Sequence, residues 1–195
     1  MVKIVYLEGC IGCGKSSCIR ELRKRGFEAH EEDLEGFRFL EEFYEDPKRY
    51  AFALQISILA SMMRQRNNAL KSASDVVFLE RSPKGSLAFI LNSYRNGHLS
   101  QKEYATLMDM MEVTQQHSTS CTSHIFLDTK PRECFARMSR RSRSCEANVP
   151  LEYVETIYAN TRGIFHLSPS VDGSLSCEDV VQRVLEVSEI SEEIV

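Results

Sequence analysis

The 195-residue sequence predicts an α/β fold, in which a parallel sheet is covered by helices on both faces. Two observations predict this class. Short apolar runs recur along the chain, as buried parallel strands do, and stretches with helical periodicity separate them. The composition, 43% hydrophobic and 27% charged, is that of an ordinary globular protein. The length suits one domain, which we place at residues 1–195.

The first half of the chain predicts three strands and two helical tracts. In order, they are a strand at residues 2–7, a helix at 16–25, a strand at 27–30, helical residues at about 37–70 and a strand at 75–80. The first helix ends in a basic turn before Gly26, which suits the negative end of the helix dipole. We expect a break in the long tract at Asp46-Pro47, because proline does not fit inside a helix.

The second half predicts two further strands among helices. In order, they are helices at 83–96 and 100–116, a strand at 124–128, helices from residue 131 and at 150–158, a weak strand at 164–167 and a helix after Ser176. Pro131 and Pro150 suit the first turn of a helix, where the missing N–H has no partner to lose. Ser176 to Asp179 resembles a capping box. The acidic residues 191–195 are expected to fray.

Charge and composition disfavour several kinds of partner. The net charge of −4 gives no overall attraction to nucleic acid, and no apolar run approaches the roughly 18 residues of a membrane span. The N-terminus does not resemble a signal peptide, so we expect a cytoplasmic protein. Seven scattered cysteines indicate a reducing compartment. Cys10-x-x-Cys13 lacks a second such pair, which disfavours a zinc or redox site.

A phosphate-binding loop follows the first predicted strand. Residues 9–16 match G-x-x-x-x-G-K-[ST], with a strand before and a helix after. This context predicts a P-loop NTPase fold that binds ATP and Mg²⁺, with Lys15 on the phosphates and the Ser16 hydroxyl on the metal ion. The predicted ATP ligands of the loop are Gly9, Gly12, Gly14, Lys15, Ser16 and Ser17. A dinucleotide-binding loop would need a third glycine where the chain has Ser17.

A nucleotide-binding switch without enzyme activity is one alternative. Asp33-x-x-Gly36 imitates a switch element of GTPases, and Thr129-Lys130-x-Arg132 follows a strand where such proteins read guanine. Arg132 stands where a carboxylate would be needed for the guanine edge. The sequence therefore favours a kinase.

A kinase needs a base for the acceptor hydroxyl and cations around the transferred phosphoryl group. Carboxylates at Glu31, Glu32 and Asp33 follow the second strand, and Glu80-Arg81-Ser82 ends the third. Arginines at 137, 140, 141 and 143 could form an anion clamp. Each charged group alone could be solvated surface. In this order after a phosphate loop, they indicate an active site.

The ordered motifs over roughly residues 3–160 resemble those of the deoxyribonucleoside kinase family, which includes thymidine-accepting kinases and deoxycytidine kinase. The resemblance implies a five-stranded parallel sheet, an arginine-rich lid at about 137–147 and a homodimer. It also implies ATP-dependent phosphorylation of the 5′-OH of a 2′-deoxynucleoside. A compact form of this family would suit a viral genome. A nucleoside monophosphate kinase, such as thymidylate kinase, is the other enzymatic alternative.

Residue roles follow from the same resemblance. Glu32, five residues before Phe37, matches the catalytic glutamate, and Glu80-Arg81-Ser82 matches a motif whose arginine contacts the reacting oxygens and whose glutamate holds Mg²⁺. The remaining matches are Tyr44 and Glu146 on the sugar 3′-OH, Gln55 on the base, and Arg137, Arg141 and Arg143 in the lid. The resemblance gives Asp128, which ends a strand, no metal role.

Base choice depends on two positions. Members that prefer deoxycytidine carry an arginine and an aspartate where this chain has Met62 and Ser86. Uncharged residues there favour thymidine, although Met62 could also be a plain core residue. Leu54 and Ile90 replace aromatic residues that usually stack on the base. The adenine-binding loop is expected near residues 168–173.

Overall fold

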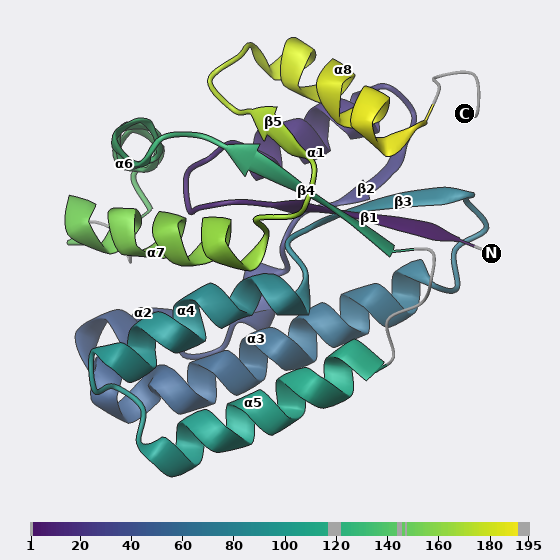
Figure 1. Ribbon diagram of the computed structural model, residues 1–195. Helices are drawn as coiled ribbons and strands as arrows, with labels where there is room; N and C mark the ends of the chain where they lie inside the picture. The colour runs from purple at the N-terminus through teal and green to yellow at the C-terminus, as the bar shows by residue number, and fades with distance from the viewer. Residues whose placement is uncertain (1, 117–121, 144–145, 147, 191–195) are drawn as a thin grey trace.

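The computed structural model describes residues 2–116, 122–143, 146 and 148–190, and its five strands form one parallel sheet (Figure 1). The sheet order is β2-β3-β1-β4-β5, from β1 (Lys3–Glu8), β2 (Glu28–His30), β3 (Val76–Glu80), β4 (Thr122–Asp128) and β5 (Ser170–Asp172). The helices are α1 (Lys15–Lys24), α2 (Leu40–Glu45), α3 (Pro47–Ala69), α4 (Pro83–Arg95), α5 (Gln101–Gln116), α6 (Pro131–Arg141), α7 (Leu151–Ile164) and α8 (Cys177–Ser188), with a 3₁₀ turn, η1 (Leu34–Gly36). The predicted α/β class with five parallel strands is confirmed.

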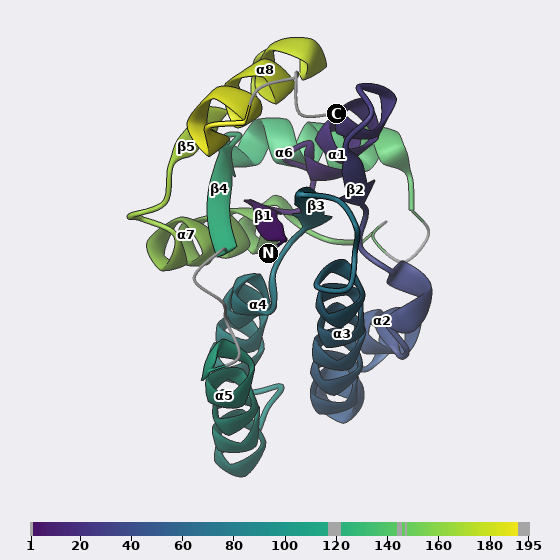
Figure 2. The ribbon, with the colours of Figure 1, turned by 90° about the vertical axis from the view of Figure 1, so that its right-hand side faces the viewer.

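Helices cover both faces of the sheet, with α1 and α8 on one face and α3, α4 and α7 on the other (Figures 1 and 2). The central strand β1 shows why its sequence is an apolar run. Its side chains alternate between faces, so Val5 and Leu7 pack in one core cluster while Ile4 and Tyr6 pack in another. None of the helices in the described part of the chain is long and apolar enough to cross a membrane.

The predicted break in the long helical tract is confirmed at Asp46. The Asp46 carboxylate accepts a hydrogen bond from the Arg49 amide at 3.3 Å, and Pro47 takes the first position of α3. The helical tract begins later than expected, because Phe39 has a left-handed backbone (φ 70°) that separates the preceding chain from α2. Asp46 therefore fixes the start of the helix that carries Gln55 and Met62.

The strand predicted at residues 164–167 is wrong. Helix α7, predicted to end near Tyr158, continues to Ile164, and Phe165 is buried just beyond its end. The fifth strand is instead β5, where Val171 alone is buried between two exposed residues. A three-residue strand with one apolar side chain carries almost no periodic signal, whereas the apolar end of α7 imitates one. Residues 191–195, expected to fray, lie outside the described residues.

Candidate active site

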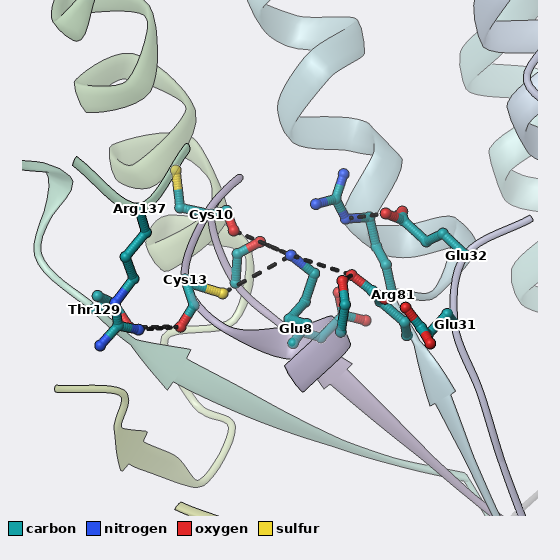
Figure 3. Close-up of polar contacts among 12 residues, drawn as sticks. Glu8, Cys10, Cys13, Glu31, Glu32, Arg81, Thr129 and Arg137 are labelled. Carbon is teal, nitrogen blue, oxygen red and sulfur yellow. Dashed lines mark hydrogen bonds and ion pairs between the residues drawn. The ribbon is translucent and has the colours of Figure 1, made fainter. Parts of the chain in front are cut away.

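The phosphate loop joins β1 to α1 and has the backbone that its glycines predict. Gly9, Gly12 and Gly14 all have φ between 76° and 148°, a region that side chains rarely adopt. A Cβ atom on Gly12 would collide with the Cys134 carbonyl. The loop is also held from outside, because the Cys13 carbonyl accepts hydrogen bonds from Thr129 Oγ1 (2.9 Å) and Arg137 Nη1 (3.1 Å), as Figure 3 shows.

Lys15 and Ser16 meet Glu80 at the mouth of this loop. The buried Lys15 ammonium donates to the Cys10 carbonyl at 3.0 Å and lies 4.0 Å from Glu80 Oε1. The Ser16 hydroxyl donates to the same carboxylate oxygen at 3.0 Å. A hydroxyl and a carboxylate beside a phosphate site suit Mg²⁺, which takes few protein oxygens and completes its shell with phosphate and water. Within the described ranges, no cluster of three His, Cys, Asp or Glu residues forms a closed metal cage.

Glu32 and Arg81 come from the ends of neighbouring strands β2 and β3 and point toward each other (Figure 3). Arg81 Nε lies 3.4 Å from Glu32 Oε1, and the Arg81 guanidinium lies 4.6 Å from the centre of the Phe89 ring. Arg81 itself has a left-handed backbone (φ 60°), which is rare for a residue with a side chain. The carboxyl ends of parallel strands thus place both groups at the crevice predicted for the active site.

Burial and the neighbouring charges shift the pKa of Glu32. Burial raises the pKa of Glu32 above its ordinary value, because a charged carboxylate is poorly solvated there, while Arg81 opposes the rise. Burial would lower the pKa of Arg81, but Glu32, Glu80 and Glu8 together raise it. Arg81 therefore stays charged, and Glu32 is a carboxylate whose affinity for a proton is increased.

Two cavities meet at this cluster. One is lined by Glu32, Tyr44, Gln55, Arg81, Ser86 and Glu146, together with apolar side chains. The other extends over the phosphate loop, has a volume of about 510 Å³, and is lined by Gly14, Ser16, Ser17 and Arg137 among others. Both cavities share the residues Gly12, Lys15, Glu80, Arg141 and Arg143. A group transferred from one cavity to the other would pass the cationic side chains of Lys15, Arg141 and Arg143.

The lid arginines are held by Glu146. Arg141 Nη2 donates to both Glu146 carboxylate oxygens, at 2.8 and 2.6 Å, and Arg143 Nη1 lies 3.5 Å from Oε1. Glu146 is buried, so its charge needs this pairing. Arg137 occupies a different place, on the backbone of the phosphate loop. The sequence placed all four residues in one lid, but it did not predict the pairing of Glu146 with two arginines.

Of the residues assigned to the base, Gln55 and Ser86 line the first cavity. Gln55 is buried, and its Oε1 has no hydrogen-bond partner among the residues that the structure describes. Ser86 Oγ donates to Met62 Sδ at 3.3 Å, so the two residues expected to govern base choice touch each other. Met62 does not line the cavity itself and acts on it only through Ser86. A buried, unpaired amide oxygen is a position where a ligand donor would be favourable.

Several features of the sequence have another explanation in the structure. The Asp33 carboxylate accepts hydrogen bonds from the Gly36 amide (3.1 Å) and from Ser61 Oγ (2.7 Å), so Asp33-x-x-Gly36 is a local cap. Asp128 accepts from the Tyr158 hydroxyl (2.6 Å) and pairs with Arg162 (2.6 Å), and it lines neither cavity. Neither arrangement indicates a GTPase or a metal ligand.

Sequence reasoning missed Glu8, the last residue of β1. Its fully buried carboxylate accepts a hydrogen bond from the Ser82 amide at 3.1 Å, while the Arg81 amide donates to the Leu7 carbonyl at 2.9 Å. Both contacts anchor the turn in which Arg81 is strained. A carboxylate ending a buried strand, one residue before a phosphate loop, is the signal that could have identified it.

The sequence profile of the family described as deoxynucleoside kinase matches residues 5–189. The chain belongs to the deoxynucleoside kinase family. A protein of Invertebrate iridescent virus 3 that carries a kinase name is 33% identical over 155 residues, covering 79% of this chain and 78% of the relative. The thymidine kinase of Ictalurid herpesvirus 1 is 27% identical over 198 residues, covering 94% of this chain and 85% of the relative.

A solved structure has the same fold. The structure of deoxyadenosine kinase from M. mycoides with bound dATP superposes with a TM-score of 0.81 at 24% identity, covering 94% of this chain and 97% of that chain. The family assignment makes this chain a kinase and favours a deoxynucleoside kinase over the switch and the monophosphate kinase. The names of its relatives mention different bases, so they assign none to this kinase.

Proposed function

We propose that this kinase transfers the γ-phosphoryl group of ATP to the 5′-OH of a 2′-deoxynucleoside and that it favours thymidine. The observation that carries the proposal is the pair of adjoining cavities, which share Lys15, Arg141 and Arg143. One cavity extends over the phosphate loop, and the other has a carboxylate and a buried amide. Phosphoryl transfer relies on positioning two substrates and neutralising the charge between them, which this arrangement provides.

In this mechanism Glu32 accepts the proton of the 5′-OH. Its raised pKa strengthens it as a base, and Arg81, 3.4 Å away, holds its carboxylate in place. Lys15 and the lid arginines stabilise the negative charge on the transferring group. Mg²⁺, held by Ser16 and Glu80 when bound, would neutralise phosphate charge. Tyr44 and Glu146 bind the 3′-OH, and Gln55 binds the base edge.

The walls of the acceptor cavity support a pyrimidine. Ser86 and Met62 are buried and uncharged, so they give the cytosine amine no charged partner and leave room for a 5-methyl group. Gln55 does not distinguish pyrimidines from purines, because its amide can turn to offer a donor and an acceptor to several bases.

The test of base preference compares kcat/KM for thymidine, deoxycytidine, deoxyadenosine and deoxyguanosine. We expect thymidine to be highest, and a higher value for either purine would contradict the proposal. The double variant Met62→Arg with Ser86→Asp should shift preference toward deoxycytidine, because the two side chains are in contact and their charges can pair. Met63→Arg, at the neighbouring position of α3, is the matched control and should leave the preference unchanged.

The homodimer and the cytoplasmic location remain predictions from the sequence. Sedimentation analysis would test the first, with a mass near twice 22.3 kDa expected. Cell fractionation would test the second.

A further inference from the structure

A third cavity lies behind the turn that carries Arg81. Its volume is about 280 Å³, far more than the roughly 10–15 Å³ that one water needs. Residues of β1, β4, α3, α4 and α5 line it. It lies on the face of the sheet that is covered by α3 and α4, which Figure 2 shows below the strands. The cavity shares no lining residue with the two cavities of the active site. Its lining includes Tyr6, Arg66, Ser82, Lys84 and His124.

Two buried donors on this cavity lack acceptors. Arg66 is 4% exposed, and its Nη1 donates to the Thr114 carbonyl at 3.2 Å, but its Nη2 has no partner among the described residues. The Tyr6 hydroxyl is also buried and also without a partner in that part of the chain. Burial raises the pKa of Tyr6 to about 12, so the hydroxyl keeps its proton and can donate. Buried donors without acceptors are rare in folded proteins and mark a place for a ligand.

The surroundings of these donors are positive. Lys84 is partly buried, with its ammonium 5.2 Å from the centre of the Phe165 ring, and it forms no salt bridge within the described ranges. Ser82 caps the N-terminus of α4, whose dipole adds positive charge at the same wall. No carboxylate is among the described lining residues.

The carboxylate of Glu8 lies beside these residues and is paired through only one of its oxygens, because its Oε2 has no hydrogen-bond partner among the described residues. Glu8 is fully buried and does not line the cavity. Its Oε1 accepts from the Ser82 amide at 3.1 Å and from His124 Nδ1 at 3.0 Å. When Nδ1 of a neutral His124 donates to Glu8, its Nε2 is an acceptor, which can take a hydrogen bond from water or from a protonated oxygen of a ligand. The cavity thus combines two unpaired donors, a lysine and a helix N-terminus.

We propose that this cavity is a second oxyanion site, which binds a small tetrahedral anion of the chemistry of inorganic phosphate. Arg66 Nη2 and the Tyr6 hydroxyl donate to its oxygens, and Lys84 contributes charge at the rim. The site is separate from the phosphate loop. Its wall at Ser82 directly follows Arg81 in the chain.

The experiment is calorimetric titration of inorganic phosphate into the protein saturated with ADP and Mg²⁺, so that the phosphate loop is occupied. We expect saturable binding to the wild type and at least tenfold weaker binding to Arg66→Met. Arg64→Met removes the same charge from an exposed position of α3 and should change the affinity less than twofold. Methyl phosphate is titrated in parallel: tighter binding would assign the site to a phosphate ester, and weaker binding to the free anion.

Absence of saturable binding to the ADP-loaded wild type would overturn the proposal. Unchanged affinity in a folded Arg66→Met variant would do the same. If Arg66→Met does not fold, Lys84→Met decides, because this partly buried side chain is expected to tolerate substitution. Weaker phosphate binding in Lys84→Met supports the site, and unchanged binding overturns it. This readout does not depend on phosphoryl transfer, so failure of the proposed kinase reaction would leave it intact.

Discussion

Glu32 is the residue on which the proposed chemistry most depends. It lies after β2, 3.4 Å from Arg81 after β3, in the cavity that also contains Gln55 and Glu146. The carboxylate lines the acceptor cavity, which shares Lys15 and Glu80 with the cavity over the phosphate loop. A base at this position is expected to contribute about 10²-fold or more to the rate.

The substitution Glu32→Gln is expected to lower kcat by about 10²-fold or more, because the amide cannot accept the hydroxyl proton. Steady-state turnover of thymidine measures this effect, and circular dichroism checks the fold. The variant should remain folded, because Glu80 and Glu8 still balance the buried charge of Arg81. Glu31→Gln is the matched control, because Glu31 pairs on the surface with Arg20 at 2.8 Å. Equal losses in both variants would remove Glu32 from the mechanism.

The raised pKa of Glu32 predicts how activity responds to acid. Below that pKa the carboxyl keeps its proton and cannot act as a base, so kcat/KM should fall as the pH drops. The fall should begin above the ordinary glutamate value of about 4.3, because burial raises the pKa. A profile of kcat/KM against pH for the wild type and Glu32→Gln tests this. The residual activity of the variant should lack the acid limb, and an identical limb in both proteins would assign it to another group.

At the residue scale, sequence motifs identified the side chains but not their contacts. Glu32, Arg81 and Glu146 match motifs, and the structure brings them to one cavity. The pairing of Glu146 with Arg141 depends on the path of the chain after α6, which no local pattern encodes. Glu8 carries no motif of its own, and its importance appears only when β1 and β3 pair.

At the scale of elements, helix α3 positions Gln55 and Met62, and its start depends on Asp46. Asp46→Ala removes the side-chain cap on the Arg49 amide and should lower the free energy of unfolding by about 1 kcal/mol. Denaturant titration measures this loss. Glu45→Ala is the control, because Glu45 is exposed and the side chain that caps α3 is that of Asp46. A midpoint unchanged by Asp46→Ala would show that Pro47 alone fixes the start of the helix.

The lid gives a second prediction at this scale. Glu146→Gln leaves Arg141 and Arg143 without their carboxylate and removes a proposed ligand of the 3′-OH. We expect KM for thymidine to rise about tenfold or more, because hydrogen bonds to charged groups are worth about 1.5–3 kcal/mol.

Glu133→Gln is the matched control for the lid. Glu133 pairs with Arg137, which keeps its bond to the Cys13 carbonyl, and Glu133 does not line the acceptor cavity. Its effect on KM for thymidine should be small. Equal increases in KM for the two variants would mean that Glu146 only shapes the lid.

Strong periodicity and capping residues predicted most elements. The three long strand patterns, the short strand at residues 27–30, the break at Asp46 and the cap at Ser176 are all confirmed. β5 could not be predicted, because its three residues carry too little pattern of their own. They form a strand because the fold places them beside β4, with which they pair. The apolar residues at 164–167 gave a false strand signal, because Phe165 is buried at the end of α7 while Leu167 is exposed and pairs with none of the described strands.

At the scale of the whole molecule, the sheet brings together residues from the ends of β1, β2 and β3 and from the lid. The acceptor cavity and the cavity at Arg66 are both lined by residues of α3 and α4, and the turn from Arg81 to Ser82 contributes one residue to each. The acceptor and phosphate cavities share one cationic boundary. This arrangement explains why a chain with a net charge of −4 can still hold polyanionic nucleotides: the positive charge is concentrated at one place.

The proposed activity is decided by measuring ATP consumption with each of the four deoxynucleosides and with dTMP, side by side, with the phosphorylated product identified by mass spectrometry. We expect 5′-phosphorylation of thymidine, little turnover of dTMP, and loss of activity in Glu32→Gln. Turnover of dTMP alone would place the protein among the monophosphate kinases. Absence of turnover on all five acceptors, despite tight binding of ATP, would contradict the roles assigned to Glu32 and Glu146.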